Sequence, residues 1–129
     1  MQQDAQSVGE KVRREVLGDE YVDAMKPADE FMNTLSTYVT ESCWGGTWAR
    51  PGLDRRARSI VTVAVLAALG RWEELQTHAG GAMRNGLTAD ELAEVLVHVG
   101  TYAGVPCAVA GFRAAAPAVA RATEADSAS

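Results

Sequence analysis

Apolar residues recur mostly every three or four positions along this 129-residue chain, and strict alternation of apolar and polar residues is scarce. That spacing places side chains on one face of an α-helix, whereas a half-buried strand would alternate. The segment from Thr88 shows it best. Thr-Ala-Asp-Glu has the pattern of a helix-capping box, and one helical face then carries Leu92, Val95, Leu96, Val99 and Tyr102. We predict an all-α fold of about six to eight helices joined by short turns.

Glycines, prolines and capping residues divide the chain into the expected helices. In chain order, we expect them at about residues 9–17, 20–25, 29–42, 54–69, 72–84, 88–103 and 107–121. Residues 1–8 and 122–129 are expected to be frayed tails. No repeat or linker interrupts the sequence, so its length favours a single domain over residues 1–129.

Two expected helices have unusual side chains. The second half of 54–69 is apolar nearly all round, which predicts a central buried helix. Small residues dominate the last helix, where they would let another helix approach closely: Ala108, Ala110, Gly111, Ala114, Ala115 and Ala116. Because an apolar face of this kind on a terminal helix often meets another subunit, we expect an oligomer.

The charge balance restricts the partners. With 17 acidic and 12 basic residues the net charge is -5, which makes nucleic acid an unfavourable partner. The arginines nevertheless cluster at Arg50, Arg55, Arg56 and Arg58. Such a positive spot indicates either an anionic small molecule or an intersubunit ion pair, and a solvated face at a helix start is the alternative.

The sequence contains no signal for a membrane or for secretion. Its longest apolar run, near Ile60–Leu69, is shorter than the roughly 20 residues that a membrane-spanning helix needs. We therefore expect no membrane partner and a cytoplasmic location. Cys43 and Cys107 lie far apart and form no CxxC pair, so reduced thiols are expected.

The stretch ESCWGGTWARPGLDRR, residues 41–56, holds several candidate site residues. Trp44 and Trp48 are four residues apart and could either pack in a core or wall a flat, apolar-edged ligand. Arg50, between Trp48 and Pro51, could present its guanidinium to a carboxylate or bond carbonyls of its own loop. Glu41 stands at an expected helix C-terminus, where the helix dipole disfavours a carboxylate, so it is either functional or exposed at a fraying end.

His78 is the first candidate for proton transfer. On its helix it shares a side with Leu75 and Ala82, and Glu74 lies one turn earlier. A partly buried histidine beside a carboxylate can act as a general acid or base, and a satisfied core histidine is the alternative. His98 has mostly polar neighbours and is expected at the surface or an interface.

Several catalytic motifs are missing from the sequence. It has no glycine-rich phosphate loop, no HExxH, no nucleophile elbow and no two-carboxylate metal motif. We therefore expect chemistry that needs neither a nucleotide nor a metal.

Taken in order, CWGGTWARPGLDRRARSIVTVAVLAAL and HAGGAMRNGLTADELAEVLVHVGTYAGVPCAVAGFR resemble the carboxymuconolactone decarboxylase family. The resemblance runs from about Gly9 to Val119. It implies an all-helical fold shared with AhpD-type alkylhydroperoxidase proteins, and a ring-like homo-oligomer, usually a hexamer, with a trimer as the alternative. It also implies the cofactor-free conversion of γ-carboxymuconolactone to β-ketoadipate enol-lactone and CO2, a step of protocatechuate breakdown.

The resemblance also implies roles for single residues. His78 matches the family's motif histidine and would transfer the proton. Arg50 matches the motif arginine and would hold a substrate carboxylate or steady the dienolate. The other implied site residues are Trp44, Trp48, Cys43 and Tyr102, which would contact a small anionic lactone, and Glu41, which would orient His78 or share the proton transfer.

Three alternatives remain at this point. The chain could act on a different anionic lactone or natural-product intermediate. It could be an AhpD-like thiol peroxidase or reductase, a chemistry that uses a nearby pair of cysteines. It could also be a non-catalytic binding or scaffolding oligomer.

Overall fold

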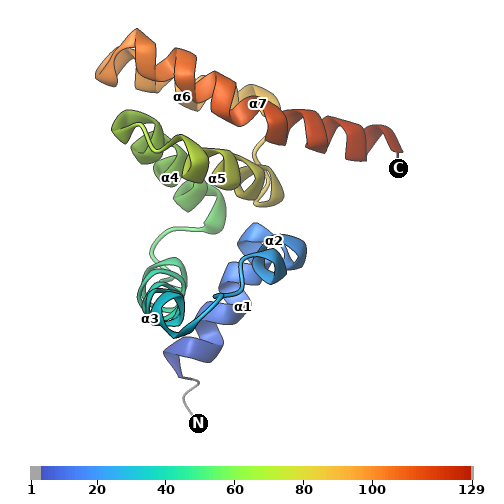
Figure 1. Ribbon diagram of the computed structural model, residues 1–129. Coiled ribbons are helices and arrows are strands. Elements are labelled where there is room, and N and C mark those ends of the chain that lie inside the picture. The colour runs from blue at the N-terminus through green and yellow to red at the C-terminus, as the bar shows by residue number, and fades with distance from the viewer. Residues whose placement is uncertain (1–3, 129) are drawn as a thin grey trace. The chain divides into compact units, whose positions relative to one another are not determined.

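The computed structural model describes residues 4–128, and all regular secondary structure in that part of the chain is helical (Figure 1). It comprises seven α-helices and one π-helix, which confirms the predicted all-α class. The chain forms two compact units, one ending at Arg55 and the other starting at Arg56, and each has its own core. A single domain over residues 1–129 stays a prediction.

The first unit contains α1 (Ala5–Leu17), α2 (Asp19–Ala24), α3 (Glu30–Tyr38) and the π-helix η1 (Val39–Trp48). Helix α1 begins four residues before the predicted start, because the Asp4 carboxylate accepts a hydrogen bond from the Ser7 amide at 2.7 Å. Residues 5–8 are therefore helical where we expected a tail, and residues 1–3 lie outside the described part.

Arg14 joins the first two helices across the turn at Gly18, whose φ is +90°. Its guanidinium bonds Glu10 on α1 at 2.8 Å, and Asp19 and Asp23 on α2 at 3.1 and 2.8 Å. These three carboxylates raise the pKa of Arg14 above its usual value. The predicted break at Gly18 is confirmed, and this charge cluster ties the two helices together.

Helix α3 starts as predicted but does not end where we expected. The Asp29 carboxylate caps it by accepting from the Met32 amide at 2.9 Å. After Tyr38 the chain continues as the π-helix η1 through Trp48, so the tryptophan segment is helical and not a connector. The i→i+5 hydrogen bonds of a π-helix are rare at this length, and π segments are frequent at functional sites.

The packing of α1 against η1 explains one glycine on each of these helices. A Cβ on Gly45 of η1 would lie 2.4 Å from the Ala5 carbonyl oxygen, and one on Gly9 of α1 would lie 2.0 Å from the Thr40 oxygen. Backbone touches backbone at both points, so only glycine fits. This close contact compensates for the poor helix propensity of the sequence.

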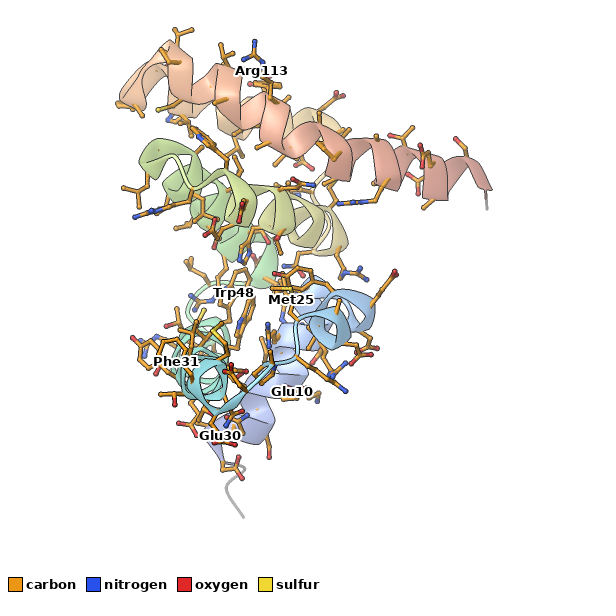
Figure 2. All side chains as sticks on the ribbon, in the orientation of Figure 1. Glu10, Met25, Glu30, Phe31, Trp48 and Arg113 are labelled. Atoms are coloured by element: carbon orange, nitrogen blue, oxygen red, sulfur yellow. The ribbon has the colours of Figure 1, made fainter. Side chains whose placement is uncertain are left out.

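The core of the first unit is small and partly aromatic. Val12 and Val16 of α1 pack against Trp44 and Trp48 of η1. The apolar side chains of α3 are not part of this core. They are exposed, with Phe31 projecting from α3 at 85% exposure (Figure 2): Phe31, Met32, Leu35 and Tyr38.

The second unit is built from α4 (Arg55–Leu69), α5 (Trp72–Arg84), α6 (Ala89–Ala103) and α7 (Val105–Ala128). Helix α7 packs along α5 and α6 (Figure 1). The core of the second unit contains residues from all four of these helices. It consists of Val63, Ala67, Leu75, Ala79, Ala82, Leu87, Leu92, Leu96, Val99, Ala115 and Ala118.

Helix α4 is buried on one side only. Val63 and Ala67 are fully buried, whereas Val61, Val65 and Leu69 on its other side are about half exposed or more. The prediction of a central helix buried all round is therefore wrong.

Helix α7 uses its small residues within the chain. A Cβ on Gly111 would lie 3.0 Å from a methyl carbon of Leu96, and Ala115 and Ala118 are buried in the core. Part of the small-residue face thus has its partner within the chain, and a contact of this face with another subunit stays a prediction. The helix also continues through residues 122–128, where we expected a frayed tail, with Pro117 inside it.

Local signals set the ends of α5 and α6 as predicted. Gly86, with φ of +102°, follows the end of α5. The side-chain amide of Asn85 donates to the buried Ser59 hydroxyl at 2.9 Å. The capping box at Thr88 is confirmed, since both of its reciprocal hydrogen bonds to Glu91 are present. No helix in the described part of the chain combines the length and apolarity needed to cross a membrane.

Two of the clustered arginines form ion pairs inside the chain. Arg55 bonds Glu15 of α1 at 3.2 Å. Arg56 pairs with the Glu91 carboxylate, and this contact, together with the Thr88 amide, lowers the pKa of Glu91 to about 2. These two side chains therefore pair within the chain while remaining 38% and 40% exposed, and an intersubunit or small-molecule role for the cluster stays a prediction.

Candidate active site

Trp44 and Trp48 stack on each other with ring centroids 5.1 Å apart and planes at 27°. They are only 3% and 7% exposed. Trp44 is thus a core residue of the first unit, as one of the two interpretations predicted. Trp48 belongs to the same core and also lines a cavity, and its role as the wall of a ligand site stays a prediction.

The cavity has a volume of about 530 Å³ and lies between α1 and the segment that follows η1, entirely within the first unit. Its size is in the range of small-molecule pockets, about 300–1,000 Å³. One part of its lining is apolar: Val8, Val12, Trp48, Ala49, Pro51 and Leu53. The other part is charged: Lys11, Glu15, Arg50, Asp54 and Arg55.

Arg50 lines this cavity as a residue held by the end of the π-helix. Its amide donates to the Thr47 carbonyl oxygen at 3.1 Å, and Pro51 follows it directly. The side chain is exposed. A guanidinium on a fixed backbone beside an indole can bind a carboxylate or an oxyanion with two donors.

Lys11 and Glu15 are cavity residues that sequence reasoning missed. They lie one turn apart on α1, so their spacing places them on the same side of that helix. The packing of α1 against η1 brings that side to the segment carrying Arg50. No local pattern in the sequence carries this information.

Glu41 and Cys43 lie on η1 in different surroundings. Glu41 is exposed in the first turn of η1, so the helix C-terminus expected beside it does not exist and the argument from the helix dipole fails. Cys43 is a half-buried free thiol. Burial raises its pKa, while the Arg13 charge acts in the opposite direction.

His78 lies on α5 on the same side as the fully buried Leu75 and Ala82, as predicted. Burial lowers the pKa of its imidazole to about 4, and the Glu74 carboxylate acts weakly in the opposite direction. The ring is therefore neutral at pH 7. It can become an acid only if an added negative charge raises that pKa.

The two remaining polar ring residues of the second unit are at its surface. His98 is exposed, as predicted, and its ring centroid lies 5.1 Å from that of Tyr102. Tyr102 is 81% exposed. It therefore does not share the buried face of Leu92, Leu96 and Val99 on which the sequence pattern placed it.

The structure thus brings together some of the predicted site residues. Trp44, Trp48 and Arg50 form one continuous region of the first unit, around the end of η1. Glu41 and Cys43 lie on the same helix, and neither lines the cavity. His78 and Tyr102 belong to the second unit.

Comparisons with known proteins agree with this description. A model of the carboxymuconolactone decarboxylase family matches residues 34–117. The chain is 42% identical over 108 residues to 4-carboxymuconolactone decarboxylase from Acinetobacter baylyi, covering 83% of this chain and 81% of that one. It is 41% identical over 102 residues to nitrosuccinic acid decarboxylase from Metarhizium robertsii, covering 78% and 71%.

A more distant relative has no described activity. An uncharacterized 15.0 kDa protein from Paracoccus denitrificans is 26% identical over 84 residues, which cover 64% of this chain and 63% of that one. The family match spans well over half of the chain and includes η1, the cavity arginine and His78. The chain belongs to the carboxymuconolactone decarboxylase family.

Proposed function

We propose that the protein is a carboxy-lyase that removes CO2 from a small anionic lactone, with 4-carboxymuconolactone as the first candidate substrate. The observation that carries this proposal is the 42% identity to a 4-carboxymuconolactone decarboxylase over most of both chains. The cavity of the first unit supports it, because an indole and a guanidinium line the same space. We place the reaction in the breakdown of aromatic compounds.

The reaction itself needs no cofactor, because the substrate provides the electron sink. The carboxylate on the γ-carbon leaves as CO2, and the electron pair of the broken bond moves through the ring double bond to the lactone carbonyl oxygen. The resulting dienolate takes one proton at the α-carbon and gives the enol-lactone. The protein must therefore steady an oxyanion and supply a proton.

The first unit is proposed to bind the substrate. The Arg50 guanidinium would hold a carboxylate or steady the dienolate oxygen, where charge develops during CO2 loss. Trp48 and Val12 would give the cavity an apolar wall, and Trp44 supports Trp48 from the core side. A low-polarity wall strips water from the departing carboxylate and so favours its loss.

His78 is proposed to transfer the proton. It is neutral at pH 7 in the free protein, since burial holds its pKa at about 4. An anionic substrate or dienolate at the imidazole would raise that pKa and let the ring carry the proton that the α-carbon receives. Glu41 as an orienting group, and Cys43 and Tyr102 as substrate contacts, complete the proposal.

We further propose that the protein is a homo-oligomer, with a hexamer as the first candidate. Exposed apolar side chains on several helices support this, because monomers rarely expose large apolar patches. They are Phe31, Leu35 and Tyr38 on α3, Val61, Val65 and Leu69 on α4, and Val97, Tyr102, Val105, Val109 and Phe112 on α6 and α7. Light scattering of the purified protein measures the mass, and a monomer would contradict the proposal.

Decarboxylation of nitrosuccinic acid is a second candidate function, because a relative of that activity is 41% identical. The test is to supply each compound separately, without added metal or nucleotide, and to measure CO2. Turnover of 4-carboxymuconolactone with little or none of nitrosuccinate is the expected result. Turnover of nitrosuccinate alone would replace the first candidate, and no CO2 from either would overturn the carboxy-lyase proposal.

The thiol-peroxidase alternative is less favourable in view of Cys43. A peroxidatic cysteine works as a thiolate and needs a lowered pKa. Burial raises the pKa of Cys43, so its thiol stays protonated at neutral pH. We propose a cytoplasmic location, where thiols such as Cys43 and Cys107 stay reduced.

A further inference from the structure

We propose that Lys11 binds a second carboxylate, the one that stays on the substrate, and that the cavity is therefore a dicarboxylate site with two separate cations. This inference rests on the proposed function and deepens it. It also assigns Arg50 to the lactone oxygen, where negative charge develops, and leaves the departing carboxylate without a cation.

Lys11 is the cavity cation that no other group in the described part of the chain engages. Among residues 4–127, no side chain or backbone oxygen bonds its ammonium group or forms an ion pair with it. The third cation of the lining, Arg55, is paired with Glu15 at 3.2 Å. That pair neutralises the carboxylate one turn away from Lys11 on the same helix, so the ammonium is available to a ligand.

The lining has the chemistry that a small dicarboxylate requires. Lys11 comes from α1, Arg50 comes from the segment after η1, and the apolar surfaces of Val12 and Trp48 belong to the same cavity. Two cations from different walls of a space of about 530 Å³ can contact two ends of one molecule. The lining carries three cations against two carboxylates, in a protein whose net charge is -5.

Decarboxylation chemistry decides which group each cation should take. An ion pair on the departing carboxylate would stabilise the ground state more than the transition state and slow the reaction. A carboxylate that remains bears the same charge throughout, so an ion pair there adds binding without that penalty. A flexible ammonium suits this role, and the fixed guanidinium of Arg50 suits the oxyanion.

The substrates for which two of the relatives are named also keep a carboxylate after they lose CO2. Nitrosuccinic acid is a four-carbon dicarboxylic acid with a nitro group, so loss of one CO2 leaves a carboxylate behind. 4-Carboxymuconolactone likewise carries one carboxyl group in addition to the one that its decarboxylase removes. In both compounds an electron sink lies next to the carbon that loses CO2.

Direct binding tests the subsite without any turnover. The probes are succinate and butyrate, which have four carbons each and differ by one carboxylate, titrated by calorimetry at low ionic strength. Wild-type protein is expected to bind succinate about tenfold more tightly, equivalent to ~1.4 kcal/mol. Lys11→Met should remove the preference, Lys11→Arg should keep most of it, and Lys26→Met, outside this cavity, should leave it unchanged.

Steady-state kinetics with 4-carboxymuconolactone provide the second readout. Lys11→Met is expected to raise KM about tenfold with little change in kcat, because the lost contact is equal in the ground and transition states. A succinate preference that survives in Lys11→Met, or is missing from the wild type, would overturn the inference. A Lys11-dependent preference in a protein that releases no CO2 would instead keep the subsite and refute the proposed function.

Discussion

Each of the two units is stabilised by a core of its own, and the two cores differ in kind. The first relies on two stacked indoles and on backbone contacts at Gly9 and Gly45, and it leaves its charged groups around an open cavity. The second packs many small and aliphatic residues, and partly buries a histidine side chain on one helix. The first arrangement suits the binding of an anion, and the second suits the tuning of a proton-transfer group. Substitutions in either unit, and a change of pH, test this difference.

The largest effect is expected from His78→Gln, which removes the imidazole that is proposed to transfer the proton. Loss of a positioned acid or base reduces kcat by about 10²–10⁴-fold. KM should change little, because the proposed binding groups of the cavity, Lys11, Trp48 and Arg50, lie in the first unit. Initial rates of CO2 release from 4-carboxymuconolactone measure both parameters, and unchanged kcat would remove His78 from the mechanism.

Gly9→Ala is expected to have the largest effect on stability. The new methyl carbon would lie 2.0 Å from the Thr40 carbonyl oxygen, so α1 and η1 must separate, at a cost of about 3 kcal/mol. The matched control is Gly80→Ala on α5, where the nearest atom is 3.9 Å away and alanine should stabilise by up to about 1 kcal/mol. Urea unfolding measures both changes, and equal shifts would contradict the account of the first core.

Stability should depend on pH through His78. Its pKa is about 4 in the folded protein and 6.5 ordinarily, so between these values only the unfolded chain binds the extra proton. The stabilisation is complete above pH 6.5 and falls by about 3 kcal/mol as the pH drops to 4. Urea unfolding at several pH values should show this dependence in the wild type, and much less of it in His78→Gln.

Arg50→Gln should impair both substrate binding in the first unit and the chemical step. Removal of one donor to a developing oxyanion lowers kcat by about 10²-fold. Since Lys11 is proposed to hold the remaining carboxylate, KM should rise less than in Lys11→Met. A variant with raised KM and wild-type kcat would instead make Arg50 the carboxylate contact and exchange the roles of the two cations.

The smallest expected effect concerns a hydrogen bond in the second unit. Asn85→Ala leaves the buried Ser59 hydroxyl without the amide that donates to it, which costs about 1–2 kcal/mol. The double variant with Ser59→Ala should lose less than the sum of the single changes, because both partners are then gone. Thermal unfolding of the three variants provides this comparison, and additive losses would show that the pair is not coupled.

The sequence predicted best those features that depend on nearby residues. The capping box at Thr88, the end of α5 at Asn85-Gly86 and the turn at Gly18 each follow from interactions within a few positions. The apolar side of His78 followed equally from helical spacing. Local hydrogen bonding and backbone conformation suffice for all of these.

Features that depend on distant contacts could not be predicted. The π-helix was not predicted, because its sequence has poor helix propensity and the close contact between Gly9 and Thr40 that supports it involves a distant helix. Lys11 gave no signal, because α1 reaches the Arg50 segment only in the folded unit. The small residues of α7 indicated a tight contact but not its partner, which is the same chain.

Turnover in D2O tests the central claim most directly. The protein is mixed with 4-carboxymuconolactone in D2O, and NMR follows the lactone and its product while CO2 is measured. We predict one CO2 and one deuterium at the α-carbon for each lactone consumed, with both rates falling together in His78→Gln. Lactone that persists without CO2 release, or product formed without deuterium at that carbon, would contradict the account.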